Sequence, residues 1–100
     1  VKANFTTNLT NYKPGDIVVP HQDIRPNDNY FKNKKFISII YYVHDTDGDT
    51  VFYDKGCKKI IKKVTPKKGR AVIFDSLIFH SFMRPIKSEK RVVINFIVNV

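Results

Sequence analysis

Cysteine is nearly absent from this sequence, since Cys57 is the only one among 100 residues. A single cysteine excludes an internal disulfide and a zinc site built from several cysteines. Chains without disulfides are typical of reducing compartments, so we expect a cytoplasmic location. Long apolar runs are also missing, because the wholly apolar stretches span only a few residues, whereas roughly 20 are needed to cross a bilayer. We therefore expect no membrane partner.

Acidic residues are scarce: 9 Asp and Glu stand against 18 Lys and Arg, which gives a net charge of +9. This balance favours acidic partners and makes a nucleic-acid-binding module one alternative function. Grooves that hold single strands interleave basic residues with stacking rings. In this chain, aromatic residues instead fall in apolar, core-like segments, at Phe36, Tyr42, Phe52, Phe74, Phe79 and Phe96. Nucleic acid is therefore not the favoured partner.

The apolar spacing of an amphipathic helix is missing as well, because no stretch of ten or more residues repeats it. Short apolar runs between Gly and Pro turns instead predict strands at residues 16–20, 36–44, 50–53, 59–64, 71–75, 79–83 and 91–100. So many short strands predict an all-β sandwich or barrel. Residues 25–35 are polar and predict a long loop. No repeat or change of composition divides the chain, so we expect residues 1–100 to form a single domain.

Two histidines and a carboxylate stand out as potential metal ligands. His21 and Asp23 lie two residues apart, so in an extended chain both project to one face. His80 lies inside an apolar run, where an imidazole needs a polar partner or a metal. Two imidazoles and one carboxylate leave open positions on an octahedral ion, as in non-haem iron(II) oxygenases. On these residues alone, the alternative is a chance triplet beside a hydrogen-bonded core histidine.

A basic residue opens the most apolar of the expected strands, residues 91–100. Arg91 alternates with Val93 and Asn95, so we expect a guanidinium and an amide on one face of this strand. The planar fork of Arg91 suits a carboxylate bound through two hydrogen bonds. A slip of one residue would turn Lys90 inward instead, and Arg91 at the strand's start would then face solvent. The sequence leaves this choice open.

Several spaced motifs, taken in order, resemble the iron(II)- and 2-oxoglutarate-dependent oxygenases and, within them, the prolyl 4-hydroxylase-like branch. The HxD…H…R/K pattern of that family appears here as His21, Asp23, His80 and Arg91. The branch's Tyr, Gly and Pro-His spacing is similar to residues 12–16 (YKPGD) followed by Pro20 and His21. Further similar segments are residues 39–43 (IIYYV), 47–52 (DGDTVF) and 64–74 (VTPKKGRAVIF). One departure is the turn at Asp47-Gly48, where the family usually has Gly-Gly.

The resemblance implies a double-stranded β-helix (jelly-roll, cupin-like) in which His21, Asp23 and His80 hold Fe(II). It further implies that Arg91, assisted by Tyr42, binds the distal carboxylate of the co-substrate 2-oxoglutarate. Tyr12 matches a tyrosine that lines the metal pocket in this branch, although a plain core role is an equal alternative. Asn95 is a further candidate for the co-substrate pocket.

The implied reaction is an O₂-dependent hydroxylation of a C–H bond, with ascorbate as reductant. A prolyl or other peptidyl side chain is the expected substrate, and a small molecule is the alternative. A non-enzymatic, metal-binding cupin-like barrel is a rival reading of the same motifs. The family normally carries a helical layer before its first strands, and little of it fits before residue 16. Because the chain also opens with Val1, we expect it to be part of a longer protein.

Overall fold

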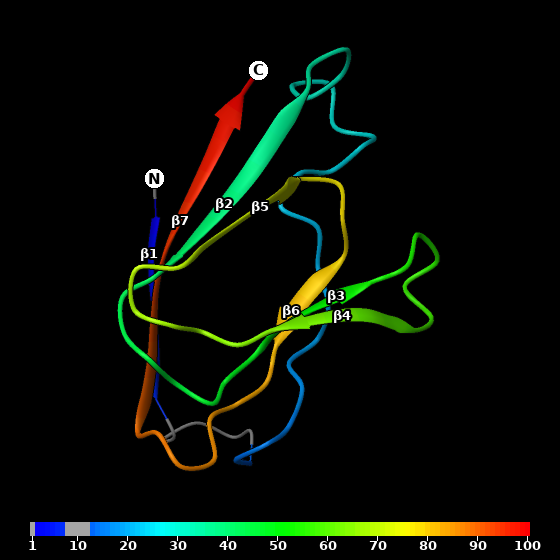
Figure 1. The fold of residues 1–100 in the computed structure, drawn as a ribbon. Coiled ribbons are helices and arrows are strands. Elements are labelled where there is room, and N and C mark those ends of the chain that lie inside the picture. Colours follow the sequence, from blue (N-terminus) through cyan, green and yellow to red (C-terminus); the bar gives the residue numbers. More distant parts are fainter. Residues whose placement is uncertain (1, 8–12) are drawn as a thin grey trace.

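The computed structural model describes residues 2–7 and 13–100 and consists of strands joined by turns and loops (Figure 1). The strands are β1 (Lys2–Thr7), β2 (Phe36–Tyr42), β3 (Thr50–Tyr53), β4 (Ile60–Val64), β5 (Ala71–Asp75), β6 (His80–Phe82) and β7 (Lys90–Asn99). Residues 25–35 form a loop of successive turns, as predicted. The described part of the chain contains no helix with the length and apolar character that crossing a membrane requires.

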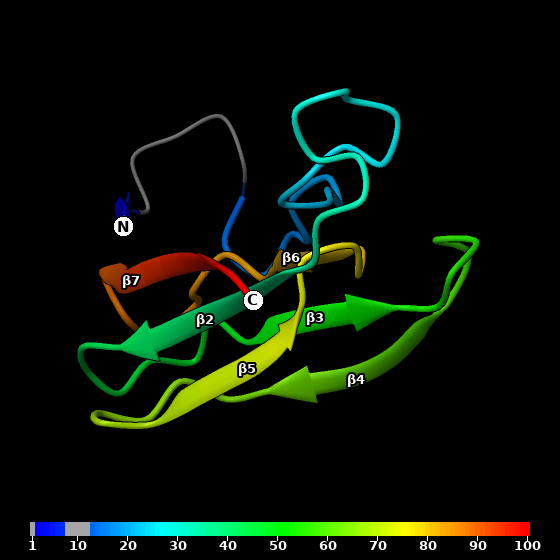
Figure 2. The same cartoon turned by 90° about the horizontal axis from the view of Figure 1, so that it is seen from above.

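The strands form two antiparallel sheets that face each other as two layers (Figure 2). The larger sheet has the order β1-β7-β2-β5, and the smaller one has the order β4-β3-β6. From β2 onward the chain crosses to the smaller sheet for β3 and β4, returns for β5, crosses again for β6 and returns for β7. This alternation is typical of a jelly roll. The predicted all-β fold class, a double-stranded β-helix core, is confirmed.

Two strand predictions are wrong. Residues 16–20 do not form a strand, although they run beside β6 and are bridged to it through Ile17–Met83 and His21–His80. Between these two bridges this segment has one more residue than the β6 side, so the ladder is interrupted. Pro20, which has no N–H to donate, lies in the interruption. The sequence prediction also missed β1, because its polar residues give little strand signal and its order comes from pairing with β7.

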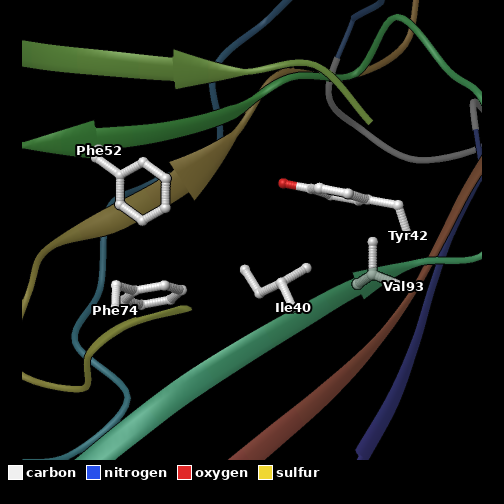
Figure 3. Packing of buried hydrophobic residues seen from close by; sticks show 5 residues of the cluster. All are labelled: Ile40, Tyr42, Phe52, Phe74 and Val93. Carbon is white, nitrogen blue, oxygen red and sulfur yellow. The ribbon is translucent and has the colours of Figure 1, made fainter. Parts of the chain in front are cut away.

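The core lies between the sheets and is centred on Ile40, Tyr42, Phe52, Phe74 and Val93 (Figure 3). Alternation along the strands selects these side chains, since Ile40 and Tyr42 of β2 point inward while Tyr41 between them is exposed. The rings of Phe52 and Phe74 meet edge to face across the two sheets, with centroids 4.9 Å apart. The inner face of the larger sheet is therefore the surface on which functional side chains can be buried.

The outer face of the larger sheet is also apolar but stays open to solvent. The strand registers place Ile39 beside Phe96 and Ile73, and Tyr41 beside Ile94, on this face. Ile73 is 65% exposed, and Tyr41 and Val98 are exposed as well. The two faces of one sheet thus differ in environment although both carry apolar residues.

Candidate metal centre and the Arg91 cluster

Backbone pairing brings His21 next to His80, although they lie 59 positions apart in the sequence. Each of the two residues donates its N–H to the carbonyl of the other, at 2.9 Å. The N–H of Asp23 then bonds to the carbonyl of Ser76, at 3.1 Å. The irregular segment before the long loop is thus fastened beside β6. This pairing places His21, Asp23 and His80, called the triad below, on one side of the smaller sheet.

The side chains of the triad converge on one carboxylate oxygen. Asp23 Oδ1 lies 3.4 Å from His21 Nε2 and 3.2 Å from His80 Nε2, and one ligand atom from each of the three residues lies within 4.8 Å of the others. Neighbouring ligands about 2.1 Å from an octahedral ion are themselves about 3 Å apart, so these donors fit a single divalent metal. Two imidazoles and a carboxylate form the donor set of non-haem Fe(II). The predicted ligands are therefore brought together.

His80 is held in the orientation that a metal ligand needs. Its ring is almost fully buried and packs against Phe74, with ring centroids 4.8 Å apart. Its Nδ1 lies 2.9 Å from the carbonyl oxygen of Ile78, which can only accept a hydrogen bond. Because Nδ1 donates its proton there, Nε2 is the ring atom left to face Asp23 or a metal. Such a fixed tautomer is the usual support of a metal-bound histidine.

Asp23 is oriented by two serines that the sequence analysis missed. Ser38 Oγ donates to Asp23 Oδ2 at 2.6 Å, so the hydroxyl of Ser76, 2.7 Å away, donates to Ser38. Oδ1 is left facing the two histidines. Burial disfavours the ionised carboxyl, but the contacts with His21 and His80 and the bond from Ser38 outweigh it and hold the pKa of Asp23 well below its usual range. Asp23 is thus an anionic ligand at neutral pH.

A second buried group, the Arg91 cluster, consists of Arg91, Gly48, Thr50 and Tyr42. Arg91 donates from Nε to the carbonyl of Gly48 at 2.8 Å and from Nη2 to Thr50 Oγ1 at 2.7 Å. The hydroxyl of Tyr42 lies 2.6 Å from the same Thr50 oxygen. Tyr42 therefore reaches Arg91 through Thr50, a residue that the sequence analysis did not single out.

Burial shifts the pKa values of Arg91 and Tyr42 but leaves both groups protonated at neutral pH. Burial lowers the pKa of Arg91 to about 10, and it raises the pKa of the Tyr42 phenol. Arg91 therefore remains a cation at neutral pH and Tyr42 remains protonated. Arg91 is 4% exposed whereas Lys90 is exposed, so the strand register turns Arg91 inward. A buried guanidinium with no carboxylate in salt-bridge distance, within the described part of the chain, is costly unless an anion joins it.

The triad and the Arg91 cluster share the space between the sheets. His80 and Phe82 alternate along β6, and the guanidinium carbon of Arg91 lies 4.5 Å from the centre of the Phe82 ring. Successive residues on one face of a strand are about 6.6 Å apart. The guanidinium of Arg91 therefore packs on the ring that neighbours His80 on the same face of β6.

Two further predicted residues have different outcomes. Asn95 lies on the inner face, where it pairs with Ile40, and its Oδ1 is buried without a hydrogen-bond partner in the structure of residues 2–7 and 13–100. Its role in the co-substrate pocket stays a prediction. Tyr12 lies outside the described residues.

Comparison with known proteins gives one assignment. A family model described as the 2OG-Fe(II) oxygenase superfamily matches residues 7–99, nearly the whole chain. The match includes every member of the triad and of the Arg91 cluster. No curated protein matches this chain.

Proposed function

We propose that this chain, which belongs to the 2OG-Fe(II) oxygenase superfamily, hydroxylates a C–H bond on a peptidyl side chain, with proline as the favoured residue. The observation that carries the proposal is the convergence of His21, Asp23 and His80 on one point, with the buried cation of Arg91 against Phe82, the next residue on the same face of β6 as His80. This arrangement suits a metal and a dicarboxylate co-substrate bound side by side.

In this proposal each residue has a defined task. Held by the triad, Fe(II) would supply the activation of O₂ that couples decarboxylation of 2-oxoglutarate to succinate and CO₂ with insertion of one oxygen atom into the substrate C–H bond. Arg91 holds the distal carboxylate, with Thr50 and Tyr42 fixing the guanidinium. The protein contributes binding and orientation, while the metal and co-substrate carry the oxidation.

A peptidyl substrate is supported by the shape of the triad and by the motifs around it. The side chain of His21 is 58% exposed, whereas those of Asp23 and His80 are 12% and 5% exposed, so the triad is reached from the His21 side. The long loop of residues 25–35 begins directly beyond Asp23. A metal site that is exposed on one side in this way can accept a side chain presented on an extended peptide. The residues that resemble the prolyl 4-hydroxylase-like branch favour proline as that side chain.

The co-substrate part of the proposal is tested by anaerobic titration. Fe(II)-loaded protein titrated with 2-oxoglutarate should develop the weak visible charge-transfer band of a metal-bound 2-oxo acid. With O₂ and ascorbate added, succinate should then form at a slow rate without substrate. Binding of both ligands with no succinate formed would instead indicate a metal-binding barrel without turnover.

The substrate part of the proposal needs a separate experiment. Succinate formation should increase with a proline-containing peptide, and the peptide should gain one oxygen atom by mass spectrometry. A single-stranded oligonucleotide is the matched competitor, because the exposed lysines of β4, Lys62 and Lys63, give that edge a positive charge. Stimulation by the oligonucleotide alone would overturn the peptidyl assignment.

A further inference from the structure

Asp47 makes an unusual set of contacts for an acidic residue in a turn. Its carboxylate accepts three backbone N–H groups in succession: Oδ2 accepts from Ile86 at 3.1 Å and from Lys87 at 2.9 Å, and Oδ1 accepts from Ser88 at 3.2 Å. These partners are about 40 residues away in the sequence. They form the loop directly before β7, the strand that carries Arg91.

Most side chains of the loop before β7 face solvent. Ile86 is 61% exposed, and Lys87, Glu89 and Lys90 are exposed as well. A segment without buried apolar side chains depends on hydrogen bonds for its order. The carboxylate of Asp47 supplies three of them at one point. Backbone N–H groups prefer an ionised carboxylate as acceptor, and such bonds are stronger than those between neutral groups.

Gly48 and Asp49, which follow Asp47, contact residues on either side of the loop before β7. The carbonyl of Gly48 accepts the Nε proton of Arg91, and the carbonyl of Asp49 accepts the N–H of Met83 at 2.9 Å. A Cβ on Gly48 would lie 2.8 Å from the carbonyl oxygen of Met83 and 3.0 Å from Arg91 Cδ. Residues 47–49 therefore contact the chain before the loop, at Met83, and after it, at the side chain of Arg91.

We propose that Asp47 is a positioning residue for the co-substrate site: its carboxylate fixes the loop at residues 86–88 and so holds Arg91 in place to receive the distal carboxylate of 2-oxoglutarate. The inference rests on the proposed function, because it assigns Arg91 that ligand. It also gives a physical reason for Asp47 at a turn position where the resembling family usually has glycine. A glycine there has no carboxylate to bind the loop.

The direction in which Asp47→Asn changes the affinity for 2-oxoglutarate distinguishes a positioning role from a simple electrostatic effect. Asp47 is a negative charge on the turn that contacts Arg91, so through space it opposes binding of another anion there. If charge alone mattered, Asp47→Asn would tighten 2-oxoglutarate binding. A positioning role predicts the opposite, because the amide keeps one acceptor oxygen and presents an NH₂ group to the remaining backbone donors.

The test is anaerobic binding of 2-oxoglutarate to the Fe(II)-loaded chain and its variants. Asp47→Asn should weaken binding about tenfold, as expected for the loss of charge-assisted hydrogen bonds, while Fe(II) affinity is unchanged. Asp47→Glu, which keeps the charge but displaces the oxygens, should weaken it as well and serves as a second variant if Asp47→Asn folds poorly. The matched control is Asp45→Asn on the same turn, whose carboxylate accepts the N–H of Lys68 and which should change affinity about twofold at most.

Two readouts separate positioning from general destabilisation. In an Arg91→Met background, Asp47→Asn should have no further effect on 2-oxoglutarate affinity, because Asp47 acts through Arg91. Hydrogen exchange should increase at Ile86, Lys87 and Ser88 and stay unchanged in β2. Unchanged or tighter 2-oxoglutarate binding by Asp47→Asn, or an equal loss in the Arg91→Met background, would overturn the inference. Failure of the unaltered chain to bind 2-oxoglutarate would instead overturn the proposed function.

Discussion

The triad and the Arg91 cluster occupy the same space between the sheets but are built in different ways. Two ligands of the triad, His21 and Asp23, come from a segment outside the regular strands, and His21 is largely exposed. In the Arg91 cluster, Tyr42, Thr50 and Arg91 all lie on strands and are buried. Under the proposed function, the exposed triad would meet the substrate and the buried cluster would hold the small anionic co-substrate. Substitutions should therefore separate metal binding from co-substrate binding.

The largest effect is expected from Asp23→Ala. This change removes the carboxylate that both histidines face, so Fe(II) binding should be lost, and the 2-oxoglutarate band with it. Metal titration with circular dichroism as a folding check measures both. Asp28→Ala, in the exposed loop, is the control and should bind Fe(II) normally. Full Fe(II) affinity in Asp23→Ala would remove Asp23 from the metal site.

The next largest effect is expected from Arg91→Met, which should weaken 2-oxoglutarate binding and leave Fe(II) binding unchanged. Loss of a charge-assisted contact in a buried site should cost about 2 to 5 kcal/mol of 2-oxoglutarate binding, several tens-fold or more in affinity. Fe(II) affinity should remain as in the unaltered chain. Lys90→Met, one residue away on the exposed face, is the control. An effect of Lys90→Met in place of Arg91→Met would contradict the inward register of Arg91.

A smaller effect, a loss of Fe(II) affinity, is expected from Ser38→Ala. Removing a group that orients a metal ligand typically lowers metal affinity about 10- to 100-fold, and Ser38 donates to Asp23 Oδ2. Competition with a metal chelator measures the change. Ser81→Ala is a matched control, since Ser81 is also buried and bonded, but to Tyr53. Equal Fe(II) affinity in the two variants would argue against support of Asp23 by Ser38.

The smallest effect is expected from Tyr42→Phe. Its hydroxyl reaches Arg91 only through Thr50, so one neutral hydrogen bond worth about 1 kcal/mol is lost, and 2-oxoglutarate affinity should fall about fivefold. Tyr53→Phe, which loses a hydroxyl contact with Ser81, is the control and should leave 2-oxoglutarate affinity unchanged. A loss as large as that of Arg91→Met would mean that Tyr42 contacts the co-substrate itself.

The parts of the molecule that could be predicted are those governed by local spacing. The alternation of Arg91, Val93 and Asn95 predicts their shared inner face, and the apolar runs at 50–53 and 71–75 coincide with β3 and β5. The HxD triplet and the distal histidine suggest a metal site by residue type and spacing, and the neighbouring motifs that resemble the oxygenase family favour it over a chance triplet. These features depend on side chains close together in the sequence or on motifs with few alternative uses.

The missed parts depend on contacts between distant segments. Ser38 and Ser76 meet Asp23 only because β2 and β5 pair beside the long loop, and serine alone carries no signal of that role. The bonds of Asp47 to residues 86–88 likewise appear only after folding. Residues 16–20 have the composition of a strand, but one extra residue and Pro20 break their ladder with β6. Sequence spacing does not encode these pairings.

The most direct test of the iron and co-substrate sites is a crystal structure of the chain with Fe(II) and 2-oxoglutarate, grown without O₂ and with data collected at the iron absorption edge. We predict one anomalous peak about 2.0 to 2.2 Å from His21 Nε2, Asp23 Oδ1 and His80 Nε2. Density for 2-oxoglutarate should run from that peak to the guanidinium of Arg91. Iron bound elsewhere, or a distal carboxylate directed away from Arg91, would contradict this assignment.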